Sequence, residues 1–563
     1  MKAIVFLILF VLTIGTSAQR YRVVISELMA DPTPTAGLPE YEWVELYNRS
    51  GSPVNLAGWR IGDETARSGP LPAFILEPDS LVVIAGATAS THLSHFARCL
   101  PVTAWPSLDN AGDHVVLYDN YGEIVHAVAY ESTWYGNAVK AEGGWSLEML
   151  WPEYPCLSGS NWAASGAAGG GSPGRAALPA TQRIPETLMV RNCYMLAPNI
   201  LTLEFSHALS ETEAGNPTHY NLFNGPAVQS VKILPPFFNR VELLLTHAAD
   251  AGVVYNITVT GIRDCTGAVV KTDTLQWGLP GDPAKADIVI NEILFNPLPD
   301  GSDYLELYNR SSRIIDARSL RIAARNGSGQ LQSITAIAQT PDLILPGQYR
   351  VYTTDTAWLH RQYPPAPQKQ VRPVASFPSY PDREGVAVLL TITGDVLDEL
   401  RYHENWHFPL LASGEGVALE RIDAGAATDD AANWHSAAGS SGFGTPGYKN
   451  SQSRLPAARS PQAFSVPARR LSPDNDGVND RLYIHYSMQE AGVVANIRIF
   501  DSRGQPVRIL ERNILLGRSG QFAWDGLDDQ QRPLMPGIYI IWVEWFDLRG
   551  NRNIWKEGIV LEK

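Results

Sequence analysis

Short runs in which apolar and polar residues alternate are the dominant pattern in this chain of 563 residues. In the first part of the chain they occupy residues 21–28, 42–48, 81–86, 114–119 and 124–130. A period of two, interrupted by Gly, Pro, Asn and Asp, predicts antiparallel β-strands. An amphipathic helical pattern is confined, in this region, to residues 89–98. The pattern therefore predicts an all-β protein.

The chain carries two copies of one sequence pattern. Residues 25–50 read ISELMADPTPTAGLPEYEWVELYNRS, and residues 290–311 read INEILFNPLPDGSDYLELYNRS. A second block recurs without a gap, each residue 272 positions later: Gly122, Tyr130, Trp134, Glu148, Asn161 and Trp162 return as Gly394, Tyr402, Trp406, Glu420, Asn433 and Trp434. Internal repeats indicate modular organisation, so we expect two copies of a module of about 150 residues.

Length and repeat spacing indicate four domains, since a domain usually spans about 100–200 residues. The expected boundaries are a signal peptide at 1–18, the first copy at 19–176, a middle domain at 180–280, the second copy at 285–450, a linker at 451–463 and a last domain at 464–563. Short strands at these intervals predict tandem Ig-like β-sandwiches, four in a row.

The first residues have the pattern of a secretory signal. Lys2 precedes an apolar run from Ala3 to Ile14, and small residues follow up to Ala18. The run is shorter than the ~20 residues of a membrane span. We expect cleavage after Ala18, no transmembrane segment in the mature chain, and a secreted or outer-cell-surface location.

The formal net charge is −14. Binding to a phosphate backbone needs clustered Lys and Arg, so we expect no nucleic-acid partner. An acidic balance of this kind is explained by solubility alone.

Four cysteines fit an oxidising compartment, where disulfides persist. Cys99 and Cys156 lie in the first copy, and Cys193 and Cys265 flank the middle domain. Of the three connectivities, the simplest pairs cysteines within modules, as Cys99–Cys156 and Cys193–Cys265. No CxxC spacing is present, which makes a metal site the less favoured alternative.

One polar set recurs in both copies as two glutamates and an asparagine. Its members are Glu27, Glu45 and Asn48, with Glu292, Glu306 and Asn309 as counterparts. Two carboxylates near an amide could bind a hard cation or act as acid and base. The alternative, which we favour, is structural: buried polar groups satisfy backbone donors where a strand meets a turn.

The residues His403-Glu404-Asn405-Trp406-His407 spell the HExxH signature of zinc proteases. That chemistry needs a helix, so that both imidazoles face one metal. Here Pro409 follows at once, and the preceding residues LDELRY read as a strand. No nucleophile elbow, P-loop or dinucleotide fingerprint is present either. We therefore expect a protein that is not an enzyme, with a metal-dependent hydrolase as the alternative.

The residues 474–480, DNDGVND, place acidic and amide oxygens around a glycine turn, like the start of a calcium loop. The candidate ligands are Asp474, Asp476, Asn479 and Asp480. The distal glutamate of an EF-hand is missing, and the favoured alternative is a turn capped by its own side chains. Calcium is the only cofactor that the sequence suggests.

The repeated module resembles the lamin-tail domain, an Ig-like sandwich also found in exported bacterial proteins. The residues that carry the resemblance are ISELMADP, EWVELYNRS, VNLAGWRIGD and LDNAGDHVVLYDNYGE. The second copy keeps the closing GTPG at 444–447, but Gly58-Trp59 becomes Ser319-Leu320, and Gly112-Asp113 becomes Glu384-Gly385. The resemblance implies the fold and a structural role for the repeated motif, and the departures of the second copy argue against a ligand surface shared by both copies.

Two other regions carry resemblances. Residues 184–278 resemble the SbsA-type Ig-like domains of surface-layer proteins, with Phe205, Tyr220, Leu222 and Tyr255 as expected core positions. The last domain, with LSPDNDGVNDRLYIHYSM and WDGLDDQQRPLMPGIYII, is similar to hook-capping-type Ig-like domains. Such domains resemble the sorting signals of type IX secretion in Bacteroidetes, which implies the secretion machinery as a partner.

Together these features predict a non-catalytic exported or cell-surface protein for adhesion, surface or matrix organisation, or polymer binding. The expected external partner is an extracellular polysaccharide or a surface protein. Loop aromatics such as Trp134, Tyr135 and Trp151 could stack on sugars or pack in the core. The alternative is an exported hydrolase, or an accessory module of a secreted nuclease or phosphatase system, because lamin-tail modules often accompany such enzymes.

Overall fold

The protein is built almost entirely of β-strands, as expected from the alternating pattern. The computed structural model describes residues 20–63, 65–176, 187–409, 411–453, 463–473 and 479–562. The signal peptide predicted at 1–18 and most of the predicted linker lie outside these ranges. The chain divides into two compact units, residues 1–250 with 255–278, and residues 251–254 with 279–563. Each unit is described by itself.

The first copy of the repeat opens unit 1. Its elements are β1 Val23–Met29, β2 Trp43–Asn48, β3 Val54–Asn55, β4 Arg60–Gly62, β5 Ile75–Leu76, β6 Leu81–Gly86, α1 Ala87–Leu93, β7 Cys99–Val102, β8 Gly112–Tyr118, β9 Ile124–Glu131, β10 Leu147–Met149 and β11 Trp162–Ala164. One sheet has the order β11-β10-β1-β2-β6-β7, and smaller sheets β4-β8-β9 and β3-β5 complete the sandwich.

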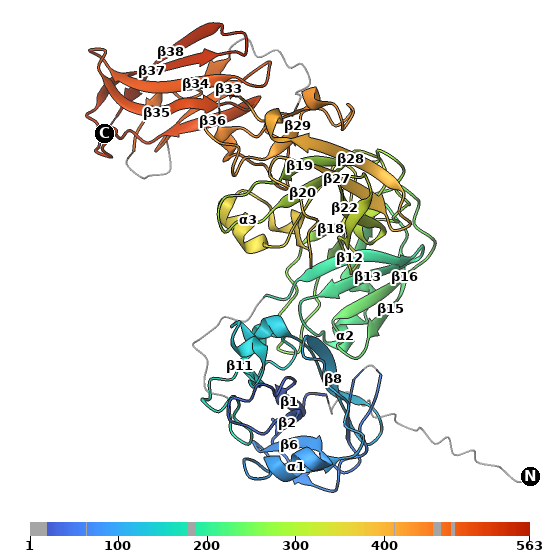
Figure 1. Ribbon diagram of the computed structural model, residues 1–563. Coiled ribbons are helices and arrows are strands. Elements are labelled where there is room, and N and C mark those ends of the chain that lie inside the picture. The colour runs from blue at the N-terminus through green and yellow to red at the C-terminus, as the bar shows by residue number, and fades with distance from the viewer. Residues whose placement is uncertain are drawn as a thin grey trace, which may run out of the picture. The chain divides into compact units, whose positions relative to one another are not determined.

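The core of the first copy lies between these sheets. Leu46 on β2 and Val115 on β8 belong to one buried cluster, as does Trp162 on β11. The helix α1 packs on the outer side against β6 and β7, through Leu93 and Ala89. It begins two residues before, and ends five residues before, the helix expected from the sequence. Figure 1 shows this helix beside β6.

The spacer domain, residues 190–277, completes unit 1. Its elements are β12 Val190–Ala197, β13 Ile200–Phe205, α2 Glu211–Ala214, β14 Tyr220–Phe223, β15 Val228–Leu234, β16 Arg240–Leu245, β17 Tyr255–Val259 and β18 Thr274–Trp277. They form the sheets β12-β13-β16-β15 and β14-β17-β18. Phe205, Tyr220 and Tyr255 are buried as predicted, whereas Leu222 is only half-buried.

The second copy forms the first and larger part of unit 2. Its elements are β19 Ile288–Leu294, β20 Tyr304–Asn309, β21 Ile315–Asp316, β22 Leu320–Arg325, β23 Leu331–Ala336, β24 Leu343–Ile344, β25 Tyr349–Thr353, α3 Thr356–Gln362, β26 Val371–Pro373, β27 Glu384–Thr391, β28 Val396–His403, β29 Leu419–Arg421 and β30 Trp434–Ser436. Its main sheet, read β30-β29-β19-β20-β25-β26, has the strand order of the first copy, including a parallel last pair.

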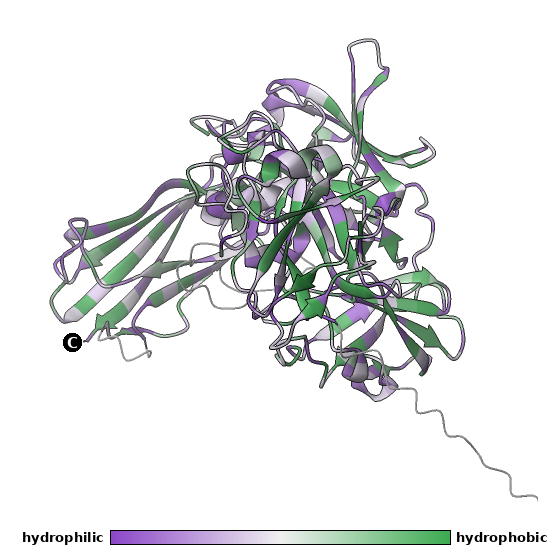
Figure 2. Cartoon of the chain, turned by 90° about the horizontal axis from the view of Figure 1, so that it is seen from below, coloured by the Kyte–Doolittle hydropathy of each residue, from purple (hydrophilic) through white to green (hydrophobic). Residues whose placement is uncertain are grey.

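The fourth domain ends unit 2. Its strands are β31 Phe464–Ser465, β32 Arg470–Leu471, β33 Leu482–Ser487, β34 Val494–Asp501, β35 Pro506–Leu515, β36 Ser519–Trp524, β37 Gly537–Phe546 and β38 Arg552–Leu561. The sheets β31-β33-β36 and β32-β38-β37-β34-β35 share one buried core that includes Ile484, Ile497 and Ile541. Figure 2 shows hydrophobic and hydrophilic residues interleaved along the strands, as two-faced sheets require.

Helices have a minor place in this fold. Among the residues that the structure describes, none of them is both long enough and apolar enough to cross a bilayer.

Candidate functional site

Three glutamates meet on the main sheet of the first copy. Glu27 on β1 pairs with Glu45 on β2 and with Glu148 on β10. A β-bulge between Ile25 and Glu27 shifts the register at this point. Residues paired across neighbouring strands place their side chains next to one another on one face. All three glutamates are buried.

The residues 171–174, GSPG, lie over these glutamates and donate hydrogen bonds to them; we call them the first closing segment. The bonds, from donor to acceptor, are Ser172 N to Glu27 Oε1 (2.8 Å), Ser172 Oγ to Glu148 Oε1 (2.7 Å) and Gly174 N to Glu45 Oε2 (2.5 Å). The closing segment is thereby attached to three strands through carboxyl oxygens.

The second copy repeats this arrangement with Glu292, Glu306 and Glu420 beneath the second closing segment, residues 444–447, GTPG. The bonds are Thr445 N to Glu292 Oε1 (2.9 Å), Thr445 Oγ1 to Glu420 Oε1 (2.8 Å) and Gly447 N to Glu306 Oε2 (2.6 Å). The bulge recurs between Ile290 and Glu292. The two copies therefore share a glutamate cluster as well as a strand order.

One hydroxyl of the second copy faces two carboxyls. Thr445 Oγ1 lies 2.9 Å from Glu292 Oε2 and 2.8 Å from Glu420 Oε1. A hydroxyl carries one hydrogen, so the two carboxyls share the single proton donor of Thr445.

Burial affects the titration of both clusters in the same direction. It raises the pKa of Glu27 to about 8, with the neighbouring Glu45 as the second cause, and that of Glu45 to about 7. Burial, followed by the charge of Glu420, raises the pKa of Glu292 to about 8. Burial also raises the pKa of Glu306 and of Glu420. Protonated carboxyls are therefore a normal part of the folded state near neutral pH.

This chemistry favours the structural interpretation of the glutamates. A carboxyl that holds its own proton is a poor ligand for a hard cation, which needs ionised oxygen. Within the described ranges, no group of three or more His, Cys, Asp or Glu side chains is placed to hold a metal ion. The oxygens are instead used by the chain's own amides and hydroxyls.

The asparagines of the predicted set lie elsewhere. Asn48 ends β2, and its Nδ2 donates to the carbonyls of Ser52 and Leu76 at 2.9 and 2.8 Å. Asn309 makes the equivalent bonds to Arg313 and Ile344. These side chains fix the turn after the strand and do not reach the glutamates. The third member of each cluster is Glu148 or Glu420, which the offset of the repeat had marked as a shared residue.

The HExxH residues do not form the α-helix that zinc binding needs; Glu404–Trp406 form a single 3-10 turn. β28 ends at His403, and the turn Glu404–Trp406 follows. His403 Nδ1 accepts from the Asn405 amide at 3.0 Å, whereas His407 Nδ1 lies 3.0 Å from Ser436 Oγ. The strand expected before the motif is confirmed, and the two imidazoles are engaged with separate partners.

The calcium prediction falls largely outside the described residues. Asp474 and Asp476 are not among them, while Asn479 and Asp480 are. The Asn479 carbonyl accepts from the Ser472 amide at 2.8 Å. Calcium binding by this loop stays a prediction.

The predicted cysteine pairing was wrong. The disulfide joins Cys156 to Cys265, and Cys99 and Cys193 are unpaired. Cys99 lies on the parallel edge strand β7, near α1, while Cys156 follows β10 and lies beside the spacer domain. Pairing within modules failed because the cross-link holds two modules together, and sequence spacing gives no sign of that.

Of the loop aromatics suggested for sugar stacking, two contribute to the core of the first copy. Trp134 packs against the first core, with its ring 6.2 Å from that of Trp162. Tyr135 is buried and Trp151 is half-buried. Sequence reasoning missed another aromatic group, Tyr118, Tyr121 and Phe238, of which Tyr121 is exposed, Phe238 half-buried and Tyr118 buried.

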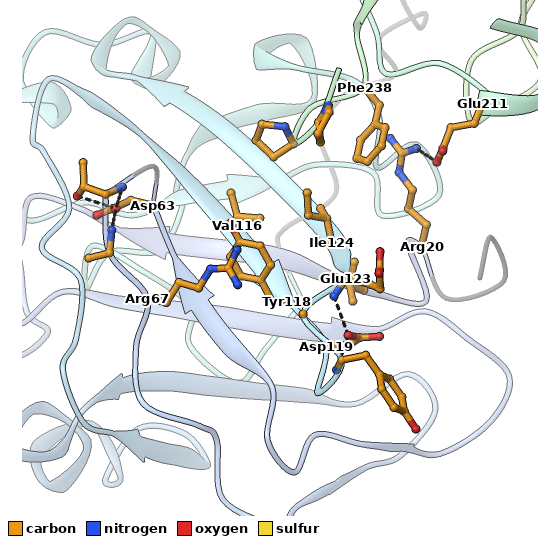
Figure 3. A pocket seen from close by; sticks show the side chains of 17 residues that line it. Arg20, Asp63, Arg67, Val116, Tyr118, Asp119, Glu123, Ile124, Glu211 and Phe238 are labelled. Atoms are coloured by element: carbon orange, nitrogen blue, oxygen red, sulfur yellow. Dashed lines mark hydrogen bonds and ion pairs between the residues drawn. The ribbon is translucent and has the colours of Figure 1, made fainter. Parts of the chain in front are cut away.

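Those residues line a cleft of about 1110 Å³ in unit 1, between the first copy and the spacer domain. Figure 3 shows Arg67 against the ring of Tyr118, and Arg20 between Phe238 and Glu211. The Arg67 guanidinium carbon lies 3.7 Å from the Tyr118 ring centre, and that of Arg20 lies 3.4 Å from the Phe238 ring centre. Arg20 also donates to Glu211 at 2.7 Å. Such stacking fixes the direction of each guanidinium.

The first copy and the spacer domain are covalently joined. The Cys156–Cys265 disulfide connects the two modules, and the Ala208 amide donates to the Cys156 carbonyl at 3.2 Å. Next to the disulfide, His207 Nδ1 lies 2.9 Å from Asp264 Oδ2, and both side chains are buried. The cleft is therefore part of a fixed junction.

A family model described as the lamin tail domain matches residues 16–132, which lie in the first copy and the residues before it. No curated protein matches the sequence. The match agrees with the resemblance seen in the repeat and covers less than half of the chain.

Several solved structures are similar at low identity. They include the N-terminal part of the bacterial S-layer protein SbsC (13% identity, covering 39% of this chain and 44% of that one, TM-score 0.16), a DUF4876 family protein from Bacteroides thetaiotaomicron (11%, 42% and 87%, 0.18) and PorZ, a surface component of the type IX secretion system of Porphyromonas gingivalis (9%, 94% and 81%, 0.16). This chain thus spans less than two thirds of the SbsC structure. TM-scores of this size carry no argument about function.

Proposed function

We propose that this chain is a non-catalytic exported protein of the cell surface that binds an extracellular polysaccharide. The observation that carries the proposal is the same in both copies: the clustered carboxyls are buried and hydrogen-bonded by the chain's own closing segment. Groups that could perform acid–base chemistry are therefore withdrawn from solvent, and the repeated module serves as a scaffold.

The surface location rests on sequence features. The apolar run after Lys2 has the form of a secretory signal. The last domain resembles sorting domains of type IX secretion, so its expected partner is that machinery. The lamin-tail match in the first copy supports the assignment to exported modular proteins.

Binding and metal analysis of one preparation test the proposal. The purified full chain should be retained by at least one insoluble polysaccharide, contain no stoichiometric zinc, and show no hydrolysis of casein or of a phosphodiester. Stoichiometric zinc that is lost in His403→Ala, together with proteolysis, would replace the proposal by the hydrolase alternative. Failure to bind any polysaccharide would also overturn it.

A further inference from the structure

The cleft of unit 1 combines an aromatic surface with hydrogen-bond donors and acceptors, a combination that sugar ligands need. It offers an exposed aromatic ring in Tyr121, hydrogen-bond donors in Arg67 and acceptors in Glu123. A sugar ring has an apolar face that stacks on aromatic rings and hydroxyls that both donate and accept. At about 1110 Å³ the cleft exceeds the usual 300–1,000 Å³ of a small-molecule site. That size suits several sugar units.

Tyr121 is held at the cleft by a rigid turn. Asp119 Oδ1 accepts from the Tyr121 amide at 2.8 Å and from the Glu123 amide at 2.9 Å. Gly122 has a φ of 86°, a backbone angle that residues other than glycine rarely adopt. Tyr121 is nevertheless 81% exposed. The fold thus holds a large aromatic side chain in solvent and provides little packing for it.

The second copy shows that the fold does not require this ring. At the offset of 272 positions, Tyr121 corresponds to Thr393 and Gly122 to Gly394, which keeps a φ of 94°. The buried Tyr118 likewise corresponds to Leu390. Both copies therefore keep the glycine turn. Only the first copy, which lines the cleft, carries a tyrosine before that glycine.

The charge of the cleft selects among sugars. Its charged lining residues are Arg20, Arg67, Asp63, Asp119, Glu123 and Glu211, two cations against four anions. Asp63 and Asp119 hold their own turns, and Glu211 is paired with Arg20. An excess of negative charge repels uronic acids and sulfated sugars. An uncharged ligand meets no such penalty.

We propose that the cleft of unit 1 binds an uncharged oligosaccharide or polysaccharide segment. Tyr121 stacks on a sugar ring, and Arg67 and Glu123 bond to its hydroxyls. Because the disulfide ties the first copy to the spacer domain, little ordering is needed on binding. The proposal rests on the proposed function and assigns its site and ligand class.

The test measures binding of the full chain to soluble neutral polysaccharides (β-glucan, xylan, mannan and starch) and to anionic ones (alginate and dextran sulfate) by calorimetry. The site variants are Tyr121→Thr, which installs the residue of the second copy, and Arg67→Ala. The matched control is Tyr483→Thr, an exposed tyrosine of the fourth domain. Each site variant should weaken binding of a neutral polysaccharide about tenfold, while the control and all unfolding midpoints stay unchanged.

Three outcomes would contradict the proposal in separate ways. If neither site variant changes the affinity for a neutral polysaccharide, the binding site lies elsewhere on the chain. Tighter binding of the anionic polysaccharides overturns the ligand class. If neither soluble nor insoluble polysaccharide binds, the proposed function fails along with the cleft.

Discussion

One backbone amide is bonded by a histidine in the first copy and by an aspartate at the equivalent position of the second copy. His126 Nδ1 accepts from the Ile25 amide at 3.0 Å, and Asp398 Oδ2 accepts from the Ile290 amide at 2.8 Å. Burial lowers the pKa of His126 to about 4, so that imidazole is neutral. Asp398 instead has a cation, Arg421, at 3.1 Å.

The change from histidine to aspartate is accompanied by a second change: Arg421 corresponds to Met149 of the first copy, 272 positions earlier. A buried neutral acceptor needs only apolar neighbours, whereas a buried carboxylate needs a partner charge. Arg421 also donates from Nε to the Ile290 carbonyl at 2.7 Å. The pair thus bonds both backbone polar groups of Ile290, the residue that precedes the bulge.

We expect Arg421→Met to destabilise unit 2 by about 3–5 kcal/mol, because it leaves the Asp398 carboxylate buried without a cation. The double variant Arg421→Met with Asp398→His recreates the arrangement of the first copy and should recover most of that loss. Urea unfolding measures both. A double variant that is no more stable than the single one would contradict the pairing.

The glutamate clusters predict a loss of stability as the pH rises. The pKa in the folded state is about 8 for Glu27, against 4.5 for an ordinary glutamate. Between these values the folded state holds more protons than the unfolded state, so the free energy of unfolding falls with rising pH. Buried histidines act oppositely: the pKa of His126 is lowered from 6.5 to about 4, so its contribution is lost as the pH falls below 6.5.

Above pH 6.5 the glutamates therefore dominate the slope, at about 1.4 kcal/mol per pH unit for one proton. Glu27→Gln should flatten this slope for unit 1 between pH 6.5 and about 8, whereas the exposed Glu142→Gln should not. Urea unfolding at several pH values is the measurement. Equal slopes for wild type and Glu27→Gln would show that Glu27 is ionised in the folded state.

At the scale of elements, each copy depends on a closing segment that makes no strand. The first and second closing segments follow β11 and β30 and attach β1, β2 and β10, or β19, β20 and β29, through glutamates. Side-chain bonds thus supply the fastening that an extra strand would provide by backbone pairing.

Replacing the central hydroxyl tests this fastening. Thr445→Val keeps the shape and removes the group that lies between Glu292 and Glu420, so we expect a loss of about 1–3 kcal/mol. Thr445→Ser, which matches Ser172 of the first copy, should keep most of the stability. Denaturation midpoints distinguish the two variants, and equal losses would assign the effect to packing of the methyl group.

The strands were predictable from short runs rich in β-branched and aromatic residues between turn residues. β1, β2, β6, β8 and β9 fall within or close to the expected runs, although β1, β2 and β6 are buried on both faces. The glutamate partnership was not predictable in full, because Glu148 is distant from Glu27 in sequence and only the bulge and strand order bring them together. Asn48 bonds the backbone at the end of β2, as the favoured structural interpretation expects, but its distance from the glutamate cluster could not be read from its sequence proximity to Glu45.

At the scale of the whole molecule, some features arise only where two modules meet. The cleft and the Cys156–Cys265 bond both arise where the first copy meets the spacer domain. Patterns within a module determine its own fold, whereas the relative placement of two modules depends on surface contacts. This is why the pairing of cysteines was wrong and the cleft was not foreseen.

The disulfide closes 109 residues of sequence, and removing such a bond typically costs about 2–5 kcal/mol. The variant Cys156→Ser with Cys265→Ser should lower the unfolding midpoint of unit 1 and leave that of unit 2 unchanged. Cys99→Ser, which removes an unpaired thiol, is the control. Calorimetry with and without reductant gives the measurement, and unchanged midpoints in the double variant would show that the bond adds no stability.

At the sugar site proposed above, affinity should depend on whether the Cys156–Cys265 bond has formed. Protein synthesised in a reducing cytosol keeps Cys156 and Cys265 as thiols, and the first copy and the spacer domain then lack their covalent tie. Two batches of identical sequence should therefore differ in affinity until air or a thiol oxidant brings them to the same value.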